Sequence, residues 1–184
     1  MVAVTGASGA PIAVRVVGAL SDARAEFDLV VSAGGRAVLR EEAGIEVEEL
    51  GRKAAHLYSD SDLAAPIASG SVRTSGMAVV PCSMNQLARI ATGLADNLIG
   101  RAAHVHLKER RPLVLVPRET PLDAIALSQM TRLTELGVIM LIASPPYYLH
   151  PRSVDDQTAY LAGKVLDHLH VPHSLYRPWK GSAP

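Results

Sequence analysis

Short apolar runs recur along this chain, and longer amphipathic segments separate them. The runs are rich in valine, leucine and isoleucine and show no polar alternation, which is typical of strands buried on both faces of a parallel sheet. Five such runs predict strands over residues 2–4, 27–31, 77–80, 113–116 and 138–143. The chain therefore contains enough buried strand for a parallel sheet.

The segments between these runs carry apolar residues at helical spacing. They predict helices over residues 12–20, 36–43, 83–92, 97–107, 122–136 and 154–169. Alternation of strand and helix indicates a doubly wound α/β fold. The most polar stretch, residues 46–62, is expected to be an excursion of helix and loop within the same domain.

Length, charge and cysteine content narrow the class of protein. A chain of 184 residues is the size of one domain, so we expect a single domain over 1–184. Eighteen basic and eighteen acidic residues cancel, which argues against nucleic acid or an anionic membrane as partner. One cysteine, no apolar run of membrane-spanning length and no basic leader favour the cytoplasm. The proline-rich tail, residues 172–184 with Trp179, is expected to pack on the surface or on a neighbouring subunit.

Loops that follow the predicted strands carry polar groups, and ligands of such folds bind at those strand ends. The loop TGASGAP after the first run offers glycines and the start of a helix, a combination that binds phosphate. Its alternative role is a tight turn in which Ser8 only caps the helix. The loop PCSMNQ after the third run places hydroxyl and amide groups at a second helix start.

Two further loops add charge and phenols. Arg118 and Glu119 stand side by side after the fourth run, and Tyr147 and Tyr148 follow the fifth. Together these loops indicate phosphate recognition with acid and base assistance.

The histidines and the cysteine suggest no metal site. His104 and His106 lie two apart on a predicted helix and point in different directions, so they are interpreted as structural or surface residues. Cys82 precedes a helix, a position that lowers a thiol pKa, although a buried structural cysteine is the commoner case. We expect no metal ligands.

Four segments of the sequence closely resemble the UbiX flavin prenyltransferase family. They are TGASGA, PCSMNQLARIATGLADNLIGRAA, LKERRPLVLVPRETPL, and PPYY with HPRSVDD a little further on. The resemblance spans essentially the whole chain, and the third string is its most specific part. It implies a flavodoxin-like three-layer α/β/α subunit, assembled as a homododecamer that binds its ligands at subunit interfaces.

The resemblance also implies which residues bind FMN and the prenyl donor. The FMN contacts would be Gly6, Ala7, Ser8, Ser32, Ser83, Met84, Asn85, Gln86 and Arg118. The prenyl-phosphate contacts would be Glu42, Arg101, Lys108, Tyr148 and Lys164. Lys108 would stabilise the departing phosphate, while Glu119 and Ser8 would manage protons.

By the same resemblance, reduced FMN is the substrate and no metal is required. Its N5 and C6 atoms take up the dimethylallyl group of dimethylallyl phosphate, and the prenylated FMN serves a UbiD-type decarboxylase. Three positions depart from the family pattern: Lys164 replaces an arginine, Gln86 a threonine, and Leu63 a tryptophan found in some relatives. The first keeps the charge but loses the planar fork of arginine.

Other functions remain open. PCSMNQ and GLADNL also resemble motifs of flavin-dependent cysteine decarboxylases, in which FMN is a redox cofactor, but the N-terminal half lacks an equivalent of their active-site histidine. An aromatic acid decarboxylase subunit and a flavin-binding storage subunit are further alternatives. The sequence shows no separate site for an aromatic acid, and a storage subunit would have no need of Lys108, Glu119, Tyr148 and Lys164 together.

Overall fold

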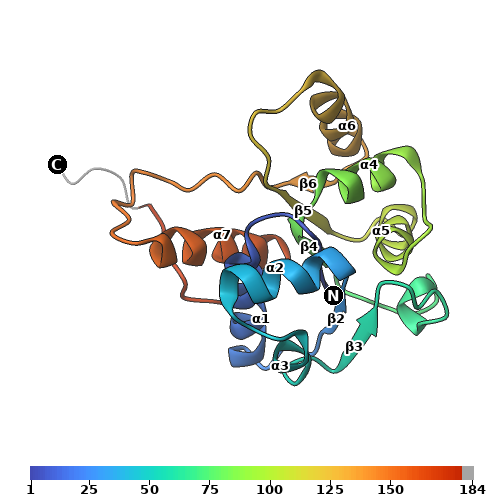
Figure 1. Cartoon of the computed structure of the whole chain (residues 1–184), viewed down its shortest axis with the longest axis horizontal. Helices are drawn as coiled ribbons and strands as arrows, with labels where there is room; N and C mark the ends of the chain where they lie inside the picture. The colour runs from blue at the N-terminus through green and yellow to red at the C-terminus, as the bar shows by residue number, and fades with distance from the viewer. Residues whose placement is uncertain (180–184) are drawn as a thin grey trace.

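The computed structural model describes residues 1–179, in which strands and helices alternate along the chain (Figure 1). The elements are β1 Val2–Val4, α1 Ala10–Asp22, β2 Asp28–Val31, α2 Ala33–Ala43, α3 Val47–Gly51, β3 His56–Ser59, a 3-10 turn η1 Pro66–Ala68, β4 Met77–Cys82, α4 Met84–Thr92, α5 Leu98–Lys108, β5 Leu113–Pro117, α6 Ala124–Glu135, β6 Ile139–Met140 and α7 Val154–His168. The doubly wound α/β prediction is confirmed.

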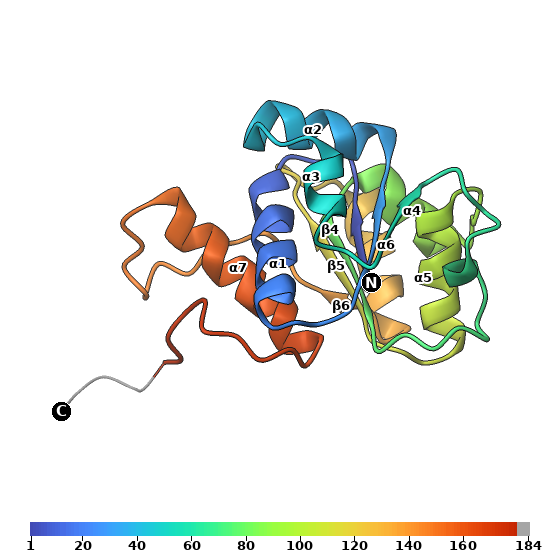
Figure 2. The ribbon, with the colours of Figure 1, turned by 90° about the horizontal axis from the view of Figure 1, so that it is seen from below.

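All strand pairs are parallel, and the strands lie in the order β3-β2-β1-β4-β5-β6. The chain winds from β1 through β2 to β3 on one side and then returns to place β4 on the other side of β1. Figure 2 shows α1 and α7 on one face of the sheet and α4, α5 and α6 on the other. The architecture is the three-layer α/β/α sandwich that the resemblance implied.

Two apolar clusters, one on each face, hold the layers together. Val2 and Val4 of β1 face the cluster that includes α1 and α7, whereas Ala3 between them faces the cluster that includes α4 and α5. All three side chains are fully buried, since β1 has helices on both sides. This double coverage explains why the strands read as continuous apolar runs.

The five predicted strands are present, but a sixth strand, β3, was missed within residues 46–62. The helix expected in that stretch is α3, whereas the loop expected after it contains His56–Ser59 paired with β2. This strand lies at the edge of the sheet and has exposed residues at both ends. Its polar sequence HLYS therefore lacks the apolar signal of a buried strand. The last strand is also shorter than predicted, and covers only Ile139–Met140.

Side-chain caps set the starts of the helices that follow the strands. The hydroxyl of Ser32 accepts from the Gly35 N–H at 3.0 Å at the start of α2, and that of Ser83 accepts from the Gln86 N–H at 3.3 Å at the start of α4. Such caps satisfy amides that have no partner within the helix. They fix where each strand-end loop turns into a helix.

No helix among residues 1–179 is long and apolar enough to cross a membrane. Within the same range, no group of three or more histidine, cysteine, aspartate or glutamate side chains is placed to hold a metal ion. The part of the tail up to Trp179 is described, whereas residues 180–184 of the predicted surface-packing tail lie outside the described residues.

His106 is one of the histidines interpreted as structural, and it is fully buried on α5. Its Nδ1 donates to the carbonyl of Ala102 at 2.8 Å, so its Nε2 accepts from the hydroxyl of Thr74 at 2.9 Å. Both nitrogens are thus satisfied in the neutral ring. Burial, which outweighs the other influences, lowers the pKa of His106 from 6.5 to about 4.

We expect this histidine to make the fold sensitive to acid. Below pH 6.5 the unfolded chain binds a proton that folded His106 does not bind until about pH 4, so stability falls as the pH falls through this window. The loss from this one group amounts to about 3 kcal/mol between pH 7 and pH 4. The free energy of unfolding, measured with urea across these pH values, should fall less steeply with acid for His106→Gln than for the wild type. His150→Gln, a change at an exposed histidine, should keep the wild-type slope.

Candidate functional site

The polar loops selected from the sequence meet at the carboxyl edge of the sheet. The loops after β1 and β4 are neighbours there, because these two strands are adjacent in the sheet. From β1 the chain adds strands toward one edge of the sheet, and from β4 it adds strands toward the other edge. The loops after β1 and β4 therefore diverge, which leaves a crevice for ligands between them. The candidate site is therefore centred on Gly6–Ser8 and Ser83–Gln86.

Thr5 connects these two loops, a role that the sequence did not reveal. Its hydroxyl donates to the carbonyl of Pro81 at 2.8 Å and accepts from the N–H of Ser83 at 2.7 Å. The side chain is only 2% exposed. Thr5 thus ties the end of β1 to the start of α4 across the switch point.

The loop after β1 also lies unusually close to the start of α2. A Cβ atom on Gly6 would come within 3.0 Å of the Cα of Gly34, and a Cβ on Gly34 would meet Gly6 at the same distance. Only glycine at both positions lets these two backbones approach in this way. The crevice therefore depends on a glycine contact between segments 28 residues apart.

Substitution of Thr5 by valine is expected to destabilise the protein by about 1 to 2 kcal/mol, since it leaves the partly buried N–H of Ser83 without its partner and the carbonyl of Pro81 with only the N–H of Thr5 at 3.3 Å. Urea unfolding measures this difference. Thr158→Val is the matched control, because the Thr158 hydroxyl is also buried but only donates to Val154 within α7. An equal loss in both variants would contradict a special role for Thr5.

The start of α1, predicted to bind phosphate, already holds a carboxylate. Oε2 of Glu42, which projects from the last turn of α2, accepts from the N–H of Gly9 at 2.8 Å and of Ala10 at 3.0 Å. These two amides are thus engaged by Glu42, which is a correction to the sequence-based picture of a free cradle. The helix dipole and the N–H groups without partners in the helix favour an anion at this position, whether it is a phosphate or the carboxylate of Glu42.

Glu42 also links Ser8 to Arg118. Partial burial opposes its ionisation, but the N–H of Gly9, the hydroxyl of Ser8, the N–H of Ala10 and the charge of Arg118 together lower the pKa of Glu42 below its usual value. The carboxylate is therefore ionised at neutral pH, with the Ser8 hydroxyl and the Arg118 guanidinium among the groups that stabilise its charge. Three predicted site residues, from the loop after β1, the last turn of α2 and the loop after β5, thus influence one another here.

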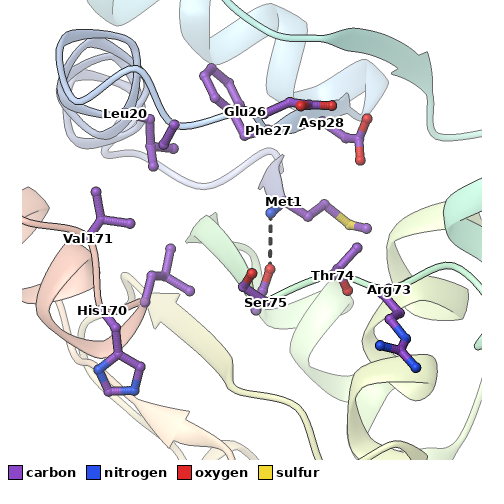
Figure 3. A pocket seen from close by; sticks show the side chains of 13 residues that line it. Met1, Leu20, Glu26, Phe27, Asp28, Arg73, Thr74, Ser75, His170 and Val171 are labelled. Carbon is purple, nitrogen blue, oxygen red and sulfur yellow. Dashed lines mark hydrogen bonds between the residues drawn. The ribbon is translucent and has the colours of Figure 1, made fainter.

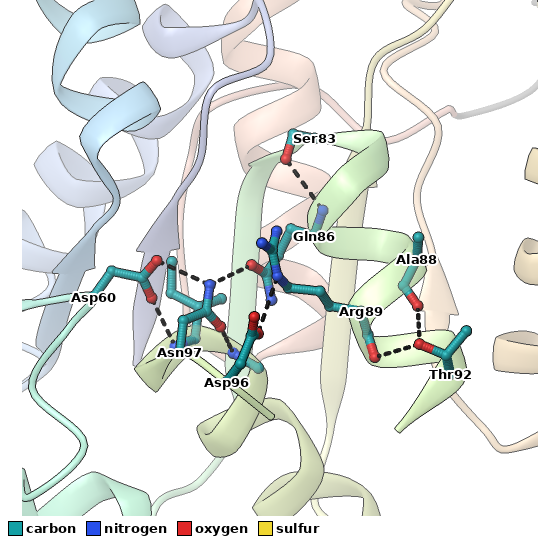
Figure 4. A network of polar contacts seen from close by, with 10 residues as sticks. Asp60, Ser83, Gln86, Ala88, Arg89, Thr92, Asp96 and Asn97 are labelled. Carbon is teal, nitrogen blue, oxygen red and sulfur yellow. Dashed lines mark hydrogen bonds and ion pairs between the residues drawn. The ribbon is translucent and has the colours of Figure 1, made fainter. Parts of the chain in front are cut away.

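A network of amides and carboxylates supports the loop after β4 (Figure 4). Oδ1 of Asn97 accepts from the Gly100 N–H at 2.8 Å, which orients its Nδ2 toward Asp60 and toward Oε1 of Gln86, each at 2.9 Å. Asp60 in turn accepts from the Ile99 N–H at 3.0 Å. Its burial raises the pKa of Asp60 above the usual value.

This network fixes Gln86, the residue that departs from the family threonine. Because its Oε1 faces Asn97, the Nε2 of Gln86 is turned the other way, and it is buried without a hydrogen-bond partner among the described residues. Gln86 itself is only 3% exposed. Its neighbours Met84 and Asn85 lie nearer the surface of the crevice.

Arg118 and Glu119 follow β5 at the same edge, and both side chains are exposed. Oε1 of Glu119 accepts from the Thr120 N–H at 2.9 Å. Among the described residues no hydrogen bond or ion pair joins Arg118 to Glu119, so the two side chains interact with different groups. The charge of Arg118 acts on Glu42, while Glu119 keeps its second oxygen available.

Lys108 is not brought to this edge in the same chain, and Arg101 points outward from α5. Both side chains are exposed and lie seven residues apart on α5, which places them on one outward face of the helix. Arg101 donates to the carbonyl of Ala68 at 3.2 Å, and Lys108 pairs with Glu109 at 2.8 Å. Lys108 lines a hollow with Leu113, the first residue of β5, and therefore lies at the amino edge, opposite Ser8.

Tyr148 and Lys164 lie in a third region, formed by α7 and the segments on both sides of it. The ring of Tyr148 packs edge-on against Trp179, with 5.4 Å between the ring centroids. Lys164 donates to Asp167 at 2.8 Å and lies over the ring of Tyr176, 5.9 Å from its centroid. One subunit thus presents its predicted site residues as three separate groups.

Cys82 is not an activated thiol. It is fully buried among apolar side chains of β4 and its surroundings, and burial raises the pKa of its thiol to about 12. The position before α4, which by itself favours a lowered pKa, is overridden by desolvation. Leu63, another departure from the family, lies in a hollow of about 390 Å³ that it shares with Arg101.

A larger hollow of about 600 Å³ lies at the amino edge of the sheet (Figure 3). Met1, Phe27, Asp28 and His170 are among the residues around it, and they come from the segments that precede the strands or follow α7. This hollow contains none of the predicted FMN contacts. Its volume alone therefore does not identify the ligand site.

The chain is similar to known flavoproteins over nearly its whole length. The sequence profile of the Flavoprotein family matches residues 1–164. The Flavin prenyltransferase UbiX of Thermoplasma acidophilum is 44% identical over 179 residues, which cover 97% of this chain and 98% of the relative.

Two solved structures are similar in fold and sequence. The AnUbiX (PadA1) structure in complex with FMN and dimethylallyl pyrophosphate superposes with a TM-score of 0.96 at 39% identity, and covers 99% of this chain and 97% of that one. A dodecameric FMN-dependent UbiX-like decarboxylase from Escherichia coli O157:H7 has a TM-score of 0.94 at 42% identity, with 98% of each chain covered. The FMN-dependent cysteine decarboxylase TvaF has a TM-score of only 0.63 at 14% identity, with 92% of this chain and 96% of that one covered, and so shares the fold alone.

Proposed function

Because this chain belongs to the UbiX flavin prenyltransferases of the flavoprotein family, we propose that it transfers a dimethylallyl group from dimethylallyl phosphate to reduced FMN. The observation that carries the proposal is the carboxyl edge of the sheet, where the Ser8 hydroxyl and the charge of Arg118 stabilise the ionised Glu42, and where Glu119 is exposed with one carboxylate oxygen bonded to the Thr120 N–H. This edge offers a hydroxyl group, a guanidinium and two carboxylates, and its cysteine, Cys82, is not activated as a nucleophile. FMN enters the reaction as a substrate.

The strand-end loops suit a flavin and its phosphate. We assign FMN binding to Gly6, Ala7, Ser8, Ser32, Ser83, Met84, Asn85, Gln86 and Arg118. Eight of these residues lie at the starts of α1, α2 and α4, and Arg118 follows β5 and supplies a positive charge. The unpartnered Nε2 of Gln86 is a further donor on this side of the sheet.

The reaction needs one leaving group and two proton transfers. The C–O bond of the donor breaks as N5 of FMN bonds to the allylic carbon, and phosphate leaves with the electron pair and takes up the proton that N5 releases. Ring closure then bonds C6 to the former alkene, which gains a proton while C6 loses one. We assign this second exchange to Glu119 and Ser8, whose hydroxyl helps to stabilise the charge of Glu42.

The departing phosphate requires cations, which we assign to Arg101, Lys108 and Lys164 with the phenol of Tyr148. Arg101 and Lys108 face outward on α5, away from Ser8 of their own chain, so they would serve the site of a neighbouring copy. The protein would accordingly work as a homo-oligomer, and the dodecamer of the Escherichia coli relative is the expected assembly. The prenylated FMN would then pass to a UbiD-type decarboxylase in the cytoplasm.

The alternative as a cysteine decarboxylase has less support. Those enzymes use an active-site histidine in the N-terminal half, and His56 is the only histidine before His104. His56 is exposed at the start of β3 and pairs with Asp28 at 2.9 Å, so it lies at the amino edge and away from the flavin loops. No histidine of that half is therefore placed for such chemistry.

Anaerobic incubation with reduced FMN and a prenyl donor tests the function directly. Mass spectrometry of the released flavin should show a gain of one isoprene unit with dimethylallyl monophosphate. Parallel reactions with the diphosphate identify the donor that the enzyme prefers. Unmodified flavin with both donors, from protein that binds FMN, would contradict the proposed function.

A further inference from the structure

We propose that Asp167 is a positioning residue that holds the ammonium of Lys164 in place for the phosphate of the prenyl donor. This inference rests on the function proposed above. It concerns a residue outside every sequence motif that carries the family resemblance. The contacts around Asp167 are the basis for it.

Three donors converge on this one carboxylate. Oδ2 of Asp167 accepts from Nζ of Lys164 at 2.8 Å and from the hydroxyl of Tyr176 at 2.5 Å, while Oδ1 lies 3.0 Å from Nε2 of His173. Burial opposes the charge of Asp167, but Lys164, Tyr176 and His173 together lower its pKa to about 2. Asp167 is therefore an anion throughout the pH range in which an enzyme of this kind would work.

The tail brings two of these donors to α7. Gly163 lies one residue before Lys164, and a Cβ on it would come within 2.6 Å of the Tyr176 ring and within 2.9 Å of the His173 ring. The absence of a side chain at Gly163 thus lets the tail lie directly on the helix. His173 is only 9% exposed in this arrangement, so the tail segment is well packed.

The same aromatic cluster reaches Tyr148, the phenol assigned to the donor site. The rings of Tyr160 and Tyr176 pack edge to face with their centroids 4.9 Å apart, and burial together with the nearby phenol of Tyr148 raises the pKa of Tyr160. Lys164 and Tyr148 are therefore connected through two tyrosines. A change at Asp167 acts on the part of the site that carries both groups.

The chemistry of lysine explains why such a carboxylate is useful here. Arginine offers a planar fork that is already shaped for phosphate, whereas lysine is a point charge at the end of a flexible stem. The ammonium has three N–H groups, of which one is engaged by Asp167, so two remain for phosphate oxygens. Asp167 would thus supply the orientation that is lost where lysine replaces arginine.

A double-mutant cycle separates positioning from general stability. Asp167→Asn should raise the KM for dimethylallyl monophosphate about tenfold and leave the FMN dissociation constant unchanged, because one ion pair orients the phosphate ligand. In a Lys164→Met background the same substitution should raise KM less than about twofold, since the ammonium it orients is gone. Calorimetric titration of FMN-loaded protein with dimethylallyl monophosphate repeats the cycle without turnover.

Asp155→Asn is the matched control, because it removes an aspartate from the same helix that pairs with Arg15 instead. It should change neither KM nor FMN binding. Equal effects of Asp167→Asn in both backgrounds would overturn the positioning role and leave the prenyltransferase function standing. Wild-type protein that neither binds nor consumes either donor would overturn the function itself, and the role of Asp167 with it.

Discussion

Replacement of Glu119 by glutamine is expected to lower the rate of FMN prenylation by about a hundredfold or more, the usual contribution of a general acid or base. Glutamine keeps an amide oxygen that can accept from the Thr120 N–H, as Oε1 of Glu119 does at 2.9 Å. The loop after β5 should therefore keep its shape while the group that exchanges a proton is lost. Single-turnover assays with reduced FMN and dimethylallyl monophosphate measure the effect.

The control for this experiment is Glu135→Gln, which makes the same change at an exposed residue at the end of α6. Its prenylation rate and FMN affinity should match those of the wild type. Glu119→Gln should also bind FMN normally, because Glu119 is not among the assigned FMN contacts and its amide keeps the hydrogen bond that shapes the loop with Arg118. A Glu119→Gln enzyme with nearly full activity would move the proton transfer to another group, with Ser8 the first to test.

Mixed oligomers of two inactive variants are expected to recover activity. In one chain Lys108 lies at the amino edge of the sheet and Glu119 at the carboxyl edge, so a site that uses both must draw them from different copies. Lys108→Met and Glu119→Gln should each be nearly inactive alone. Co-expressed in equal amounts, they should regain about a quarter of wild-type activity, the fraction of sites that receive two intact residues by chance.

The control is a chain that carries both substitutions, co-expressed with the wild type. It should also give about a quarter of the wild-type activity at equal amounts, because the chance of two intact residues per site is the same. Absence of recovery in the first mixture, from oligomers that contain both variants, would mean that Lys108 and Glu119 act within one chain or not in one site. Mass spectrometry of the intact oligomers verifies that the chains have mixed.

The departures from the family pattern have different consequences in the structure. Leu63 lines a hollow with Arg101, and its replacement of a tryptophan leaves an aliphatic wall there. Gln86 belongs to a buried network with Asn97 and Asp60, which orients its amide. Lys164 is held by Asp167 and lies over the ring of Tyr176. Only at positions 86 and 164 do hydrogen-bonded neighbours hold the side chain that departs from the family pattern.

The sequence was sufficient for features that depend on neighbours along the chain. Apolar runs of buried strands, amphipathic spacing and capping residues such as Ser32 and Ser83 are local, so five strands and the loops at their carboxyl ends were predicted correctly. The same locality explains the miss at β3. An edge strand is defined by its pairing with β2, and its polar residues carry no periodic signal.

Only the tertiary structure decided which groups meet and in what state. The bridge from Thr5 to Ser83 and the reach of Glu42 to Gly9 join residues 78 and 33 positions apart, and no short pattern encodes them. The same is true of the convergence of Lys164, His173 and Tyr176 on Asp167. Desolvation is equally non-local, and it makes Cys82 a core residue despite its place before a helix. The sequence by itself thus determined five strands and the loops at their carboxyl ends, while long-range packing determined the edge strand, the hydrogen-bond partners and the charge states.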